Sequence, residues 1–208
     1  MSETKYMSQD YYNTIDKPGM AEYKDRNSKF VAYALPIKSV DDFKTQLAQI
    51  KKEHPKAGHH CFAYRLGLDG NTFRVSDDGE PSGSAGKPIL GQIDSKQVTN
   101  VLIVVVRYFG GTLLGVPGLI NAYKTAASFA LQVTPSVQKP VMENYHLQFD
   151  YTQMNALMTI IKQFDCVILK QEIQLFCTMD IGISKNRLQE VLFRLKDIRE
   201  IDIKKIAD

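Results

Sequence analysis

The stretch Asn100–Gly115, NVLIVVVRYFGGTLLG, decides the fold of the N-terminal part of this chain. Its first half is a continuous run of aliphatic residues, which is typical of a central strand that is buried on both faces. The two glycines that follow end this strand. The next segment, Leu119–Val133, is rich in alanine and predicts a helix, with Pro117 near its first turn. The stretch therefore predicts a buried strand that leads through a glycine-rich loop into a helix.

Three segments upstream of this strand predict further elements. Lys29–Ile37, KFVAYALPI, is β-branched and aromatic, and a proline near its end marks it as a strand. A serine then precedes apolar residues at helical spacing, which predicts a helix from Val40 onward. The segment His59–Leu68 alternates, and an Asp-Gly-Asn turn connects it to Thr72–Ser76, so that these two segments predict a hairpin.

Two prolines within VTPSVQKPVM indicate a domain boundary near Lys139, which divides the chain into domains 1–139 and 140–208. Apolar patterns in the second domain predict six elements: strand 141–151, helix 153–164, strand 166–171, strand 174–183, helix 186–196 and strand 201–206. The order β-α-β-β-α-β is that of the ferredoxin-like split unit. The expected fold class is therefore α+β with two domains.

The composition is that of an ordinary globular protein, with 208 residues, 44% hydrophobic and 24% charged. The longest strongly apolar run, Val101–Val106, is far shorter than the ~20 residues of a membrane helix. The N-terminal stretch has no apolar core of signal-peptide length. Three irregularly spaced cysteines fit a reducing compartment. We therefore expect a cytoplasmic protein with no membrane partner.

Charge is distributed unevenly along the chain. Residues 1–140 contain 17 basic and 13 acidic side chains, whereas residues 141–208 contain 9 and 10. A mildly basic first part attracts phosphate-bearing partners. This excess is nevertheless well below the dense basic patch that would by itself indicate nucleic-acid binding.

The loop Asp77–Leu90, DDGEPSGSAGKPIL, raises the question of a phosphate-binding or catalytic motif. A Walker loop requires glycine at position 81 and a hydroxyl residue after its lysine, but both positions hold proline. Ser82 lacks both flanking glycines of a nucleophile elbow. The segment Ser84–Lys87 matches S-x-x-K, but that motif requires a helical turn, which Gly86 and Pro88 oppose. The loop thus predicts neither nucleotide hydrolysis nor a serine nucleophile.

A cluster of histidine and cysteine at the start of the hairpin raises two further possibilities. On a strand, His59 and Cys61 share one face and His60 points to the other, so at most two of them converge. Structural zinc requires four ligands, and we therefore expect no metal and no cofactor. A cysteine nucleophile needs a nearby base and a lowered pKa, whereas a free cysteine such as Cys61 more often packs in a core. Cys166 and Cys177 lie in apolar strand patterns, which indicates structural roles.

The segment RYFGGTLLG links the buried strand to the helix that follows. Its glycines permit close backbone approach, and the N-terminus of the following helix favours anions. Arg107 at the strand end either contacts a phosphate or carboxylate of a partner, or pairs with one of Asp77, Asp78 and Glu80 and so holds the two loops together. The residues alone leave both interpretations open.

Together these blocks resemble the IMPACT/YigZ family over nearly the whole chain. The resemblance is carried by HHCFAYR, by DDGEPSGSAGKPIL and by VVVRYFGGTLLG with GLINAY. Two positions depart from the family pattern. The chain has Val116-Pro117 where the family usually has Thr-Gly, and Asn121 where it has a basic residue, so a flexible glycine and a cation are missing beside the expected site.

The resemblance implies a fold and a role. Domain 1–139 is expected to be a ribosomal-protein domain-2-like α/β sandwich, similar to domain IV of elongation factor G. The ferredoxin-like domain is expected to be similar to domain V of that factor. The family resemblance also implies association with RNA or the ribosome and regulation of translation, because its eukaryotic relatives resemble a translation regulator.

We expect the two glycine-rich loops to meet in one electropositive recess. The residues expected to bind an anion or nucleic acid are Arg65, Ser82, Gly83, Ser84, Gly86, Lys87, Arg107, Gly110 and Gly111. Those expected to organise the loops are His59, Cys61, Asp77, Asp78, Glu80 and Tyr108. The main hypothesis is a non-enzymatic protein that binds RNA or the ribosome. The alternatives are a hydrolase of a small or peptide substrate, which would use Cys61, His59 and the acidic loop, and a protein-interaction module.

Overall fold

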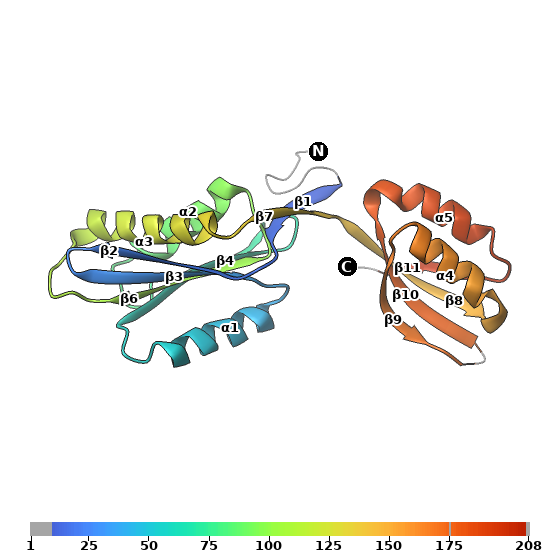
Figure 1. Ribbon diagram of the computed structural model, residues 1–208, viewed down its shortest axis with the longest axis horizontal. Helices are drawn as coiled ribbons and strands as arrows, with labels where there is room; N and C mark the ends of the chain where they lie inside the picture. The colour runs from blue at the N-terminus through green and yellow to red at the C-terminus, as the bar shows by residue number, and fades with distance from the viewer. Residues whose placement is uncertain (1–9, 175, 207–208) are drawn as a thin grey trace. The chain divides into compact units, whose positions relative to one another are not determined.

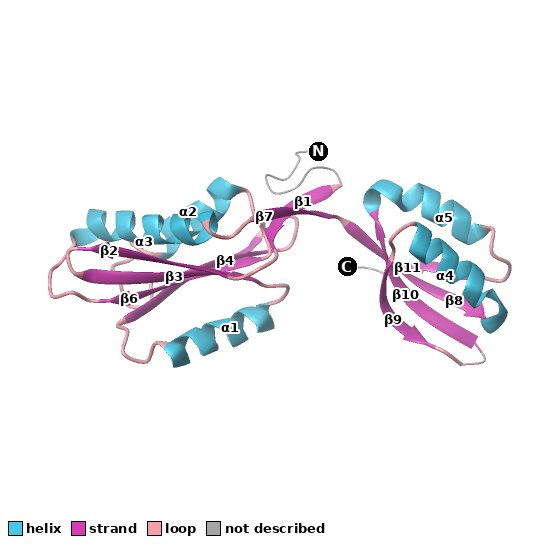
Figure 2. Cartoon of the chain, in the orientation of Figure 1, coloured by secondary structure: helices cyan, strands magenta, loops and turns pink. Residues whose placement is uncertain are grey.

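The computed structural model describes residues 10–174 and 176–206, so that residues 1–9, 207–208 and Leu175, within the predicted strand 174–183, lie outside the described residues. The chain forms two compact units, Met1–Lys139 and Pro140–Asp208. Each unit combines helices with antiparallel sheet, and the α+β class is confirmed (Figures 1 and 2). Among the described residues, no helix is both long and apolar enough to span a membrane.

The first unit is built on a five-stranded antiparallel sheet with the order β2-β3-β6-β4-β5. These strands are β2 (Gly19–Asp25), β3 (Ser28–Pro36), β6 (Val101–Tyr108), β4 (His59–Leu66) and β5 (Thr72–Ser76). The central strand is β6, the apolar run of the sequence, and its first seven residues are all buried. A separate two-stranded sheet pairs β1 (Tyr11–Ile15) with β7 (Ser136–Pro140).

Helices cover both faces of the five-stranded sheet. Helices α2 (Gly86–Lys96) and α3 (Gly115–Gln132) lie on one face, and α1 (Val40–Glu53) lies on the other (Figure 1). Alternate side chains of β6 enter two separate cores. The core beneath α2 and α3 receives Val101, Ile103 and Val105. The core beneath α1 receives Leu102, Val104 and Val106. The prediction of a strand buried on both faces is thus confirmed.

Helix α2 contradicts one expectation. Gly86 and Pro88 were expected to oppose helical structure, but α2 begins at Gly86 and Pro88 lies in its first turn. Proline is tolerated there because the first N–H groups of a helix have no intrahelical acceptor. Glycine is needed at position 86, where a Cβ atom would lie 2.9 Å from the backbone nitrogen of Ser76. Strands β1 and β2 also lie outside the predicted elements.

The second unit shows the predicted order β-α-β-β-α-β. Its four-stranded antiparallel sheet has the order β11-β8-β10-β9. The elements are β8 (Met142–Asp150), α4 (Met154–Gln163), β9 (Val167–Glu172), β10 (Phe176–Ser184), α5 (Leu188–Lys196) and β11 (Asp202–Lys205). Short 3₁₀ turns precede both helices. One core joins the two helices to the sheet and includes the buried Cys177.

Candidate binding site at the glycine-rich loops

The two glycine-rich loops meet around a buried ion pair. Arg107 lies near the end of β6, and Glu80 lies in the loop between β5 and α2. The Arg107 Nη1 atom donates a hydrogen bond of 2.7 Å to Glu80 Oε1, and the two side chains are only 6% and 4% exposed. His59 of β4 pairs with Arg107 across the sheet, and its Nε2 atom lies 3.9 Å from the same oxygen. Two segments far apart in sequence are thereby joined.

Helix α3 contributes Tyr123 to this cluster. Its hydroxyl group donates a 2.7 Å hydrogen bond to Glu80 Oε1. The sulfur of Cys61 lies 3.3 Å from the Tyr123 oxygen and 3.0 Å from the carbonyl oxygen of Asp77. Burial raises the pKa of Cys61 to about 12 and also raises the pKa of Tyr123 far above its ordinary value. Both side chains therefore keep their protons, and Cys61 lacks the thiolate that a nucleophile requires.

Asp77 caps helix α2 from nine residues upstream. Its Oδ1 atom accepts hydrogen bonds from the backbone N–H groups of Ala85 (3.0 Å) and Gly86 (2.8 Å), and Oδ2 accepts one from Gly83 (2.8 Å). Burial opposes ionisation of this carboxyl group, but the three backbone bonds outweigh it, so the pKa of Asp77 is lowered. The N–H groups of Gly83 and Gly86, which were expected to face an external anion, are instead occupied by a carboxylate of the protein itself.

The remaining residues of this loop divide between interior and surface. Ser84 is fully buried, and its hydroxyl group donates to the carbonyl oxygen of Pro81 (2.6 Å). Ser84 was expected to face a partner, but its side chain lies in the interior. Ser82 and Lys87 are exposed. Of the anion-binding residues predicted in this loop, these two side chains are the ones that reach solvent.

Asp78 fastens the loop to the start of β4. Its Oδ2 atom accepts a 2.7 Å hydrogen bond from the backbone N–H of His60, and its carbonyl oxygen lies 2.8 Å from Nδ1 of His59. Asp78 has a positive φ of 41°. Lys51 of α1 lies 3.7 Å from its other carboxylate oxygen. The start of β4, the end of α1 and the loop are thus held together.

The second loop is packed tightly against the turn between β2 and β3. The N–H of Gly110 donates to Ser28 Oγ (3.2 Å), and a Cβ atom at position 110 would lie 2.1 Å from the carbonyl carbon of Asn27. Gly111 has a φ of +85° in open space. Phe109 is 56% exposed, and its ring centre lies 5.5 Å from the guanidinium carbon of Arg107. This loop therefore presents an aromatic ring and a glycine to solvent.

Two predicted site residues lie elsewhere. Arg65 pairs in register with Val101, at the other end of β6 from Arg107, and its Nη2 atom binds Asp94 of α2 at 2.6 Å. The Tyr108 hydroxyl group binds His54 at 2.7 Å on the opposite face of the sheet. Neither residue contributes to the loops. Together with the Arg107–Glu80 pair, these placements contradict a recess whose positive charge comes from Arg65 and Arg107.

Two members of the cluster, Tyr123 and Ser28, are not among the site residues that the sequence predicted. Tyr123 is the one large polar side chain on the buried face of an alanine-rich helix, and that mismatch could have identified it. Ser28, whose hydroxyl group lies 3.5 Å from Arg107 Nη2, carries no sequence signal because it looks like any turn residue. Among the described residues, no group of three or more His, Cys, Asp or Glu side chains is placed to bind a metal ion.

Comparison with known proteins defines the class. Residues 26–131 match the Impact N-terminal domain. The chain is 35% identical over 170 residues to an IMPACT family member of Haemophilus influenzae, covering 81% of this chain and 82% of that protein. It is 32% identical over 184 residues to the IMPACT family member YigZ of Escherichia coli, covering 88% and 90%.

A crystal structure described as that of a hypothetical protein is similar over both units. It has a TM-score of 0.79 and 29% identity, and covers 97% of this chain and 100% of its own. This is therefore a two-domain α+β protein whose first unit carries an Impact N-terminal domain. The chain belongs to the IMPACT family. Protein IMPACT of Rattus norvegicus is 35% identical over 98 residues, which are 46% of this chain and 31% of that longer protein.

Proposed function

We propose that this protein regulates translation as a non-enzymatic binding protein that associates with RNA or the ribosome. The contact surface would be formed by the exposed residues of the two joined loops, Ser82, Lys87, Phe109 and Gly111, here called the loop surface. The observation that carries the proposal is the Arg107–Glu80 pair, because it fixes the two loops as one rigid surface. The expected fold, which the family resemblance implies to be similar to domains IV and V of elongation factor G, also supports a role in translation.

Binding is favoured over hydrolysis because the polar side chains beneath the loop surface are engaged with one another. The thiol group of Cys61 is buried and protonated. The Nδ1 atom of His59 is held by the Asp78 carbonyl, and Glu80 is paired with Arg107. A hydrolase would need a nucleophile and a base that both reach a substrate. This cluster stabilises the loops and leaves no such pair at the surface among the described residues.

RNA is favoured as the partner because the loop surface exposes both a cation and an aromatic ring. An exposed lysine such as Lys87 contacts phosphates, while an exposed ring such as Phe109 stacks on an unpaired base. Stacking contributes about 1–3 kcal/mol per base in proteins that bind single strands. The mild positive charge of residues 1–140 adds a long-range attraction.

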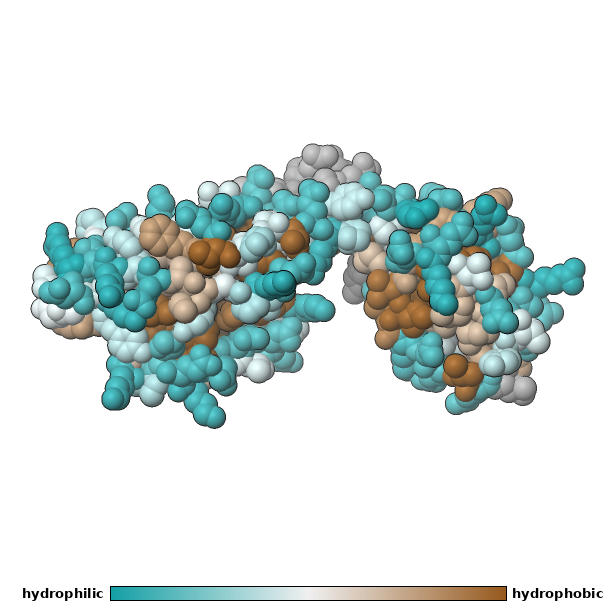
Figure 3. Space-filling model, in the orientation of Figure 1, coloured by the Kyte–Doolittle hydropathy of each residue, from teal (hydrophilic) through white to brown (hydrophobic). Residues whose placement is uncertain are grey.

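A protein partner is the second candidate. Leu113 is 81% exposed, and Val116 and Ile120 are exposed on one side of the first turns of α3. Residues four apart on a helix are neighbours, so Val116 and Ile120 form a short exposed apolar strip that follows Leu113 in the chain. Hydrophobic side chains reach the surface of both units (Figure 3). A ribosomal protein would suit such a strip, and rRNA would suit Lys87.

The proposal is tested by cosedimentation with bacterial ribosomes and by binding to protein-free cellular RNA at 50–200 mM salt. Wild-type binding should weaken as salt rises, because each phosphate contact releases counterions. Lys87→Ala should lower the slope of log affinity against log salt by about one, and Phe109→Ala should weaken RNA binding by about 1–3 kcal/mol. Lys162→Ala, an exposed lysine of α4, is the matched control.

Three results would contradict parts of this proposal. Absence of both cosedimentation and RNA binding would eliminate the proposed role. Unchanged binding by Lys87→Ala and Phe109→Ala would eliminate the loop surface as the contact. Loss of ribosome binding in Leu113→Ser alone, with no effect of salt, would replace RNA by a protein partner.

A further inference from the structure

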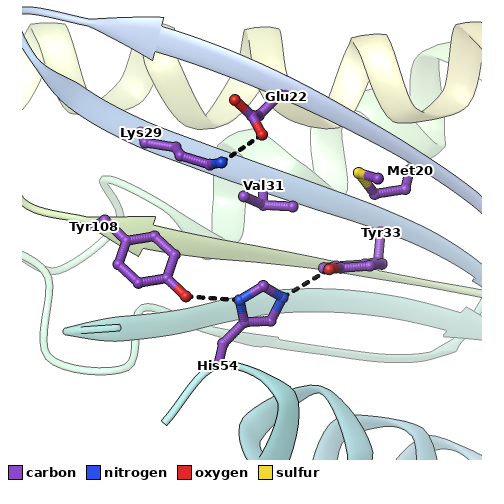
Figure 4. A pocket seen from close by; sticks show the side chains of 7 residues that line it. All are labelled: Met20, Glu22, Lys29, Val31, Tyr33, His54 and Tyr108. Atoms are coloured by element: carbon purple, nitrogen blue, oxygen red, sulfur yellow. Dashed lines mark hydrogen bonds and ion pairs between the residues drawn. The ribbon is translucent and has the colours of Figure 1, made fainter. Parts of the chain in front are cut away.

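A concave site lies on the face of the five-stranded sheet that α1 partly covers. Its cavity of about 390 Å³ is lined by Met20, Glu22, Lys29, Val31, Tyr33, His54 and Tyr108, and is here called the Tyr33 pocket (Figure 4). Helix α1 covers this face over β4 and β6, whereas outward-facing residues of β2 are exposed, with Met20 at 56%. The pocket therefore lies where the helix ends and the sheet is open. The pocket shares no residue with the loop surface. Arg107, which lies beneath the loop surface, and Tyr108, which lines the pocket, are successive residues whose side chains point to opposite faces of the sheet.

One edge of the pocket is a row of three linked side chains. His54, the C-cap of α1, binds the Tyr33 hydroxyl group through Nε2 at 2.6 Å and the Tyr108 hydroxyl group through Nδ1 at 2.7 Å (Figure 4). A neutral imidazole has one N–H group and one acceptor nitrogen. With the ring in this form, one phenol donates to it while the other accepts from it; with both ring nitrogens protonated, both phenols accept. In either form at least one phenol keeps its own O–H for a ligand. Burial raises the pKa of Tyr33, so its hydroxyl group stays protonated.

The other edge is an ion pair. Lys29 Nζ lies 2.5 Å from Glu22 Oε2, and this hydrogen bond lowers the pKa of Glu22. The ammonium group has further N–H donors and the carboxylate has further lone pairs, so a donor and an acceptor lie side by side. In Figure 4, Val31 lies between the two polar edges, and Met20 flanks the pocket on the side of Tyr33. The floor is thus apolar and both rims are polar.

These features define the chemistry of the ligand. An apolar floor fits the face of a flat ring, and the two rims each offer a donor together with an acceptor. A purely apolar ligand would leave the polar rims without hydrogen bonds, at a cost in free energy. A phosphate group would meet Glu22 as well as Lys29. The ligand that satisfies the floor and both rims is an uncharged heteroaromatic ring with donors and acceptors on its edges.

We propose that the Tyr33 pocket binds one unstacked nucleobase. Two sources of the same chemistry supply such a base, a free nucleotide and a single-stranded RNA. Its face would pack on Val31 and Met20, one edge would meet the Tyr33–His54–Tyr108 row, and another edge would meet Lys29 and Glu22. The sugar and phosphate would remain in solvent over the open strand β2. The pocket would bind the base without any contribution from the loop surface.

The test is saturation-transfer NMR and calorimetric titration of the full chain with the four ribonucleoside 5′-monophosphates. Ribose 5-phosphate serves as the probe without a base, and single-stranded RNA hexamers supply the second source. Saturation should reach the base protons of at least one nucleotide or hexamer, with shifts at the Met20 and Val31 methyl groups. Ribose 5-phosphate should give none. Binding of hexamers without mononucleotides would identify RNA as the source.

Substitutions assign the binding to the pocket. Tyr33→Phe and Tyr108→Phe remove a hydroxyl group each and keep the ring, so each should weaken binding by about two- to tenfold. Tyr151→Phe, an exposed tyrosine of the second unit, is the matched control and should change nothing. Met20→Ala alters an exposed side chain, so it should weaken base binding without unfolding the protein.

The proposal is overturned if neither mononucleotides nor hexamers show saturation at millimolar concentration. It is also overturned if ribose 5-phosphate binds as well as the nucleotides, or if both phenylalanine variants bind with unchanged affinity. Because nucleotide titration uses no ribosomes, its failure is independent of the cosedimentation result. The two proposals can therefore fail separately.

Discussion

Arg107 and Glu80 are 27 residues apart in the chain, yet their side chains form a 2.7 Å ion pair in the interior of the first unit. The same Glu80 oxygen accepts the hydroxyl group of Tyr123. The Arg107 Nε atom has no hydrogen-bond partner among the described residues, so the guanidinium group depends strongly on Glu80. The stability of both loops is therefore linked to one carboxylate.

Glu80→Ala is expected to lower the free energy of unfolding by about 3–5 kcal/mol, because it leaves a buried cation without its partner. Urea unfolding followed by the NMR amide signals of β4 measures this loss, since the chain has no tryptophan. Lys204→Ala is the control, because it breaks an exposed pair with Asp202. That change should cost less than about 1 kcal/mol. Equal losses of unfolding free energy in the two variants would show that the buried pair stabilises the protein no more than an exposed pair does.

Asp77→Asn tests the remote helix cap. The pKa of Asp77 is lower in the folded chain, so its stabilising effect is complete above the unfolded-state pKa of about 3.9 and is lost as pH falls through the folded value. The substitution should therefore cost about 1–2 kcal/mol at pH 7 and progressively less as the pH falls below the unfolded-state pKa. Urea titrations at several pH values measure this difference. A difference that stays constant with pH would mean that the charge is unimportant.

Cys61 should be inert in the folded protein. With a pKa of about 12, its thiolate fraction at pH 8 is about 10⁻⁴, and the side chain is fully buried. Iodoacetamide at pH 8 should leave Cys61 unmodified in the folded chain and modify all three cysteines in urea, as read by peptide mass spectrometry. Cys166, which is half-buried, gives an internal comparison. Rapid labelling of Cys61 in the folded protein would show a reactive thiolate and would support the hydrolase alternative.

Two glycine substitutions should act in opposite directions. Gly110→Ala places a methyl group 2.1 Å from the backbone of Asn27, so it should destabilise the protein by about 1–3 kcal/mol or more. Gly91→Ala lies within α2, where the new Cβ atom has no neighbour within 4 Å, and should stabilise it by about 0.5–1 kcal/mol. Thermal and urea unfolding compare the two variants. An unchanged free energy of unfolding in Gly110→Ala would show that the second loop moves to accommodate the methyl group at little cost.

The elements that the sequence predicted well are those specified by local pattern. Strand β6 is a continuous apolar run, and α1 has apolar residues at helical spacing, so both were identified without knowledge of the fold. Helix α2 was missed because Gly86 and Pro88 stand in its first turn, and because its cap, Asp77, lies nine residues before its first residue. A capping residue that far away is recognisable only once the chain has folded.

The candidate site was predicted only in part for the same reason. Arg65 and Arg107 both lie on strands that lead to loops, but the register of β4 on β6 places them at opposite ends of the sheet. The glycine-rich loop looked like an anion-binding site, and an anion does occupy its N–H groups. That anion is the carboxylate of Asp77, and a short sequence motif cannot distinguish an internal ligand from an external one.

Among the described residues of unit 1, the first and last strands pair with each other instead of joining the five-stranded sheet, and an ion pair between Asp16 and Lys139 reinforces this contact. The described part of this unit therefore begins and ends in the same two-stranded sheet. A folded body with adjacent ends can be spliced into a longer polypeptide, or circularly permuted, without stretching either flank.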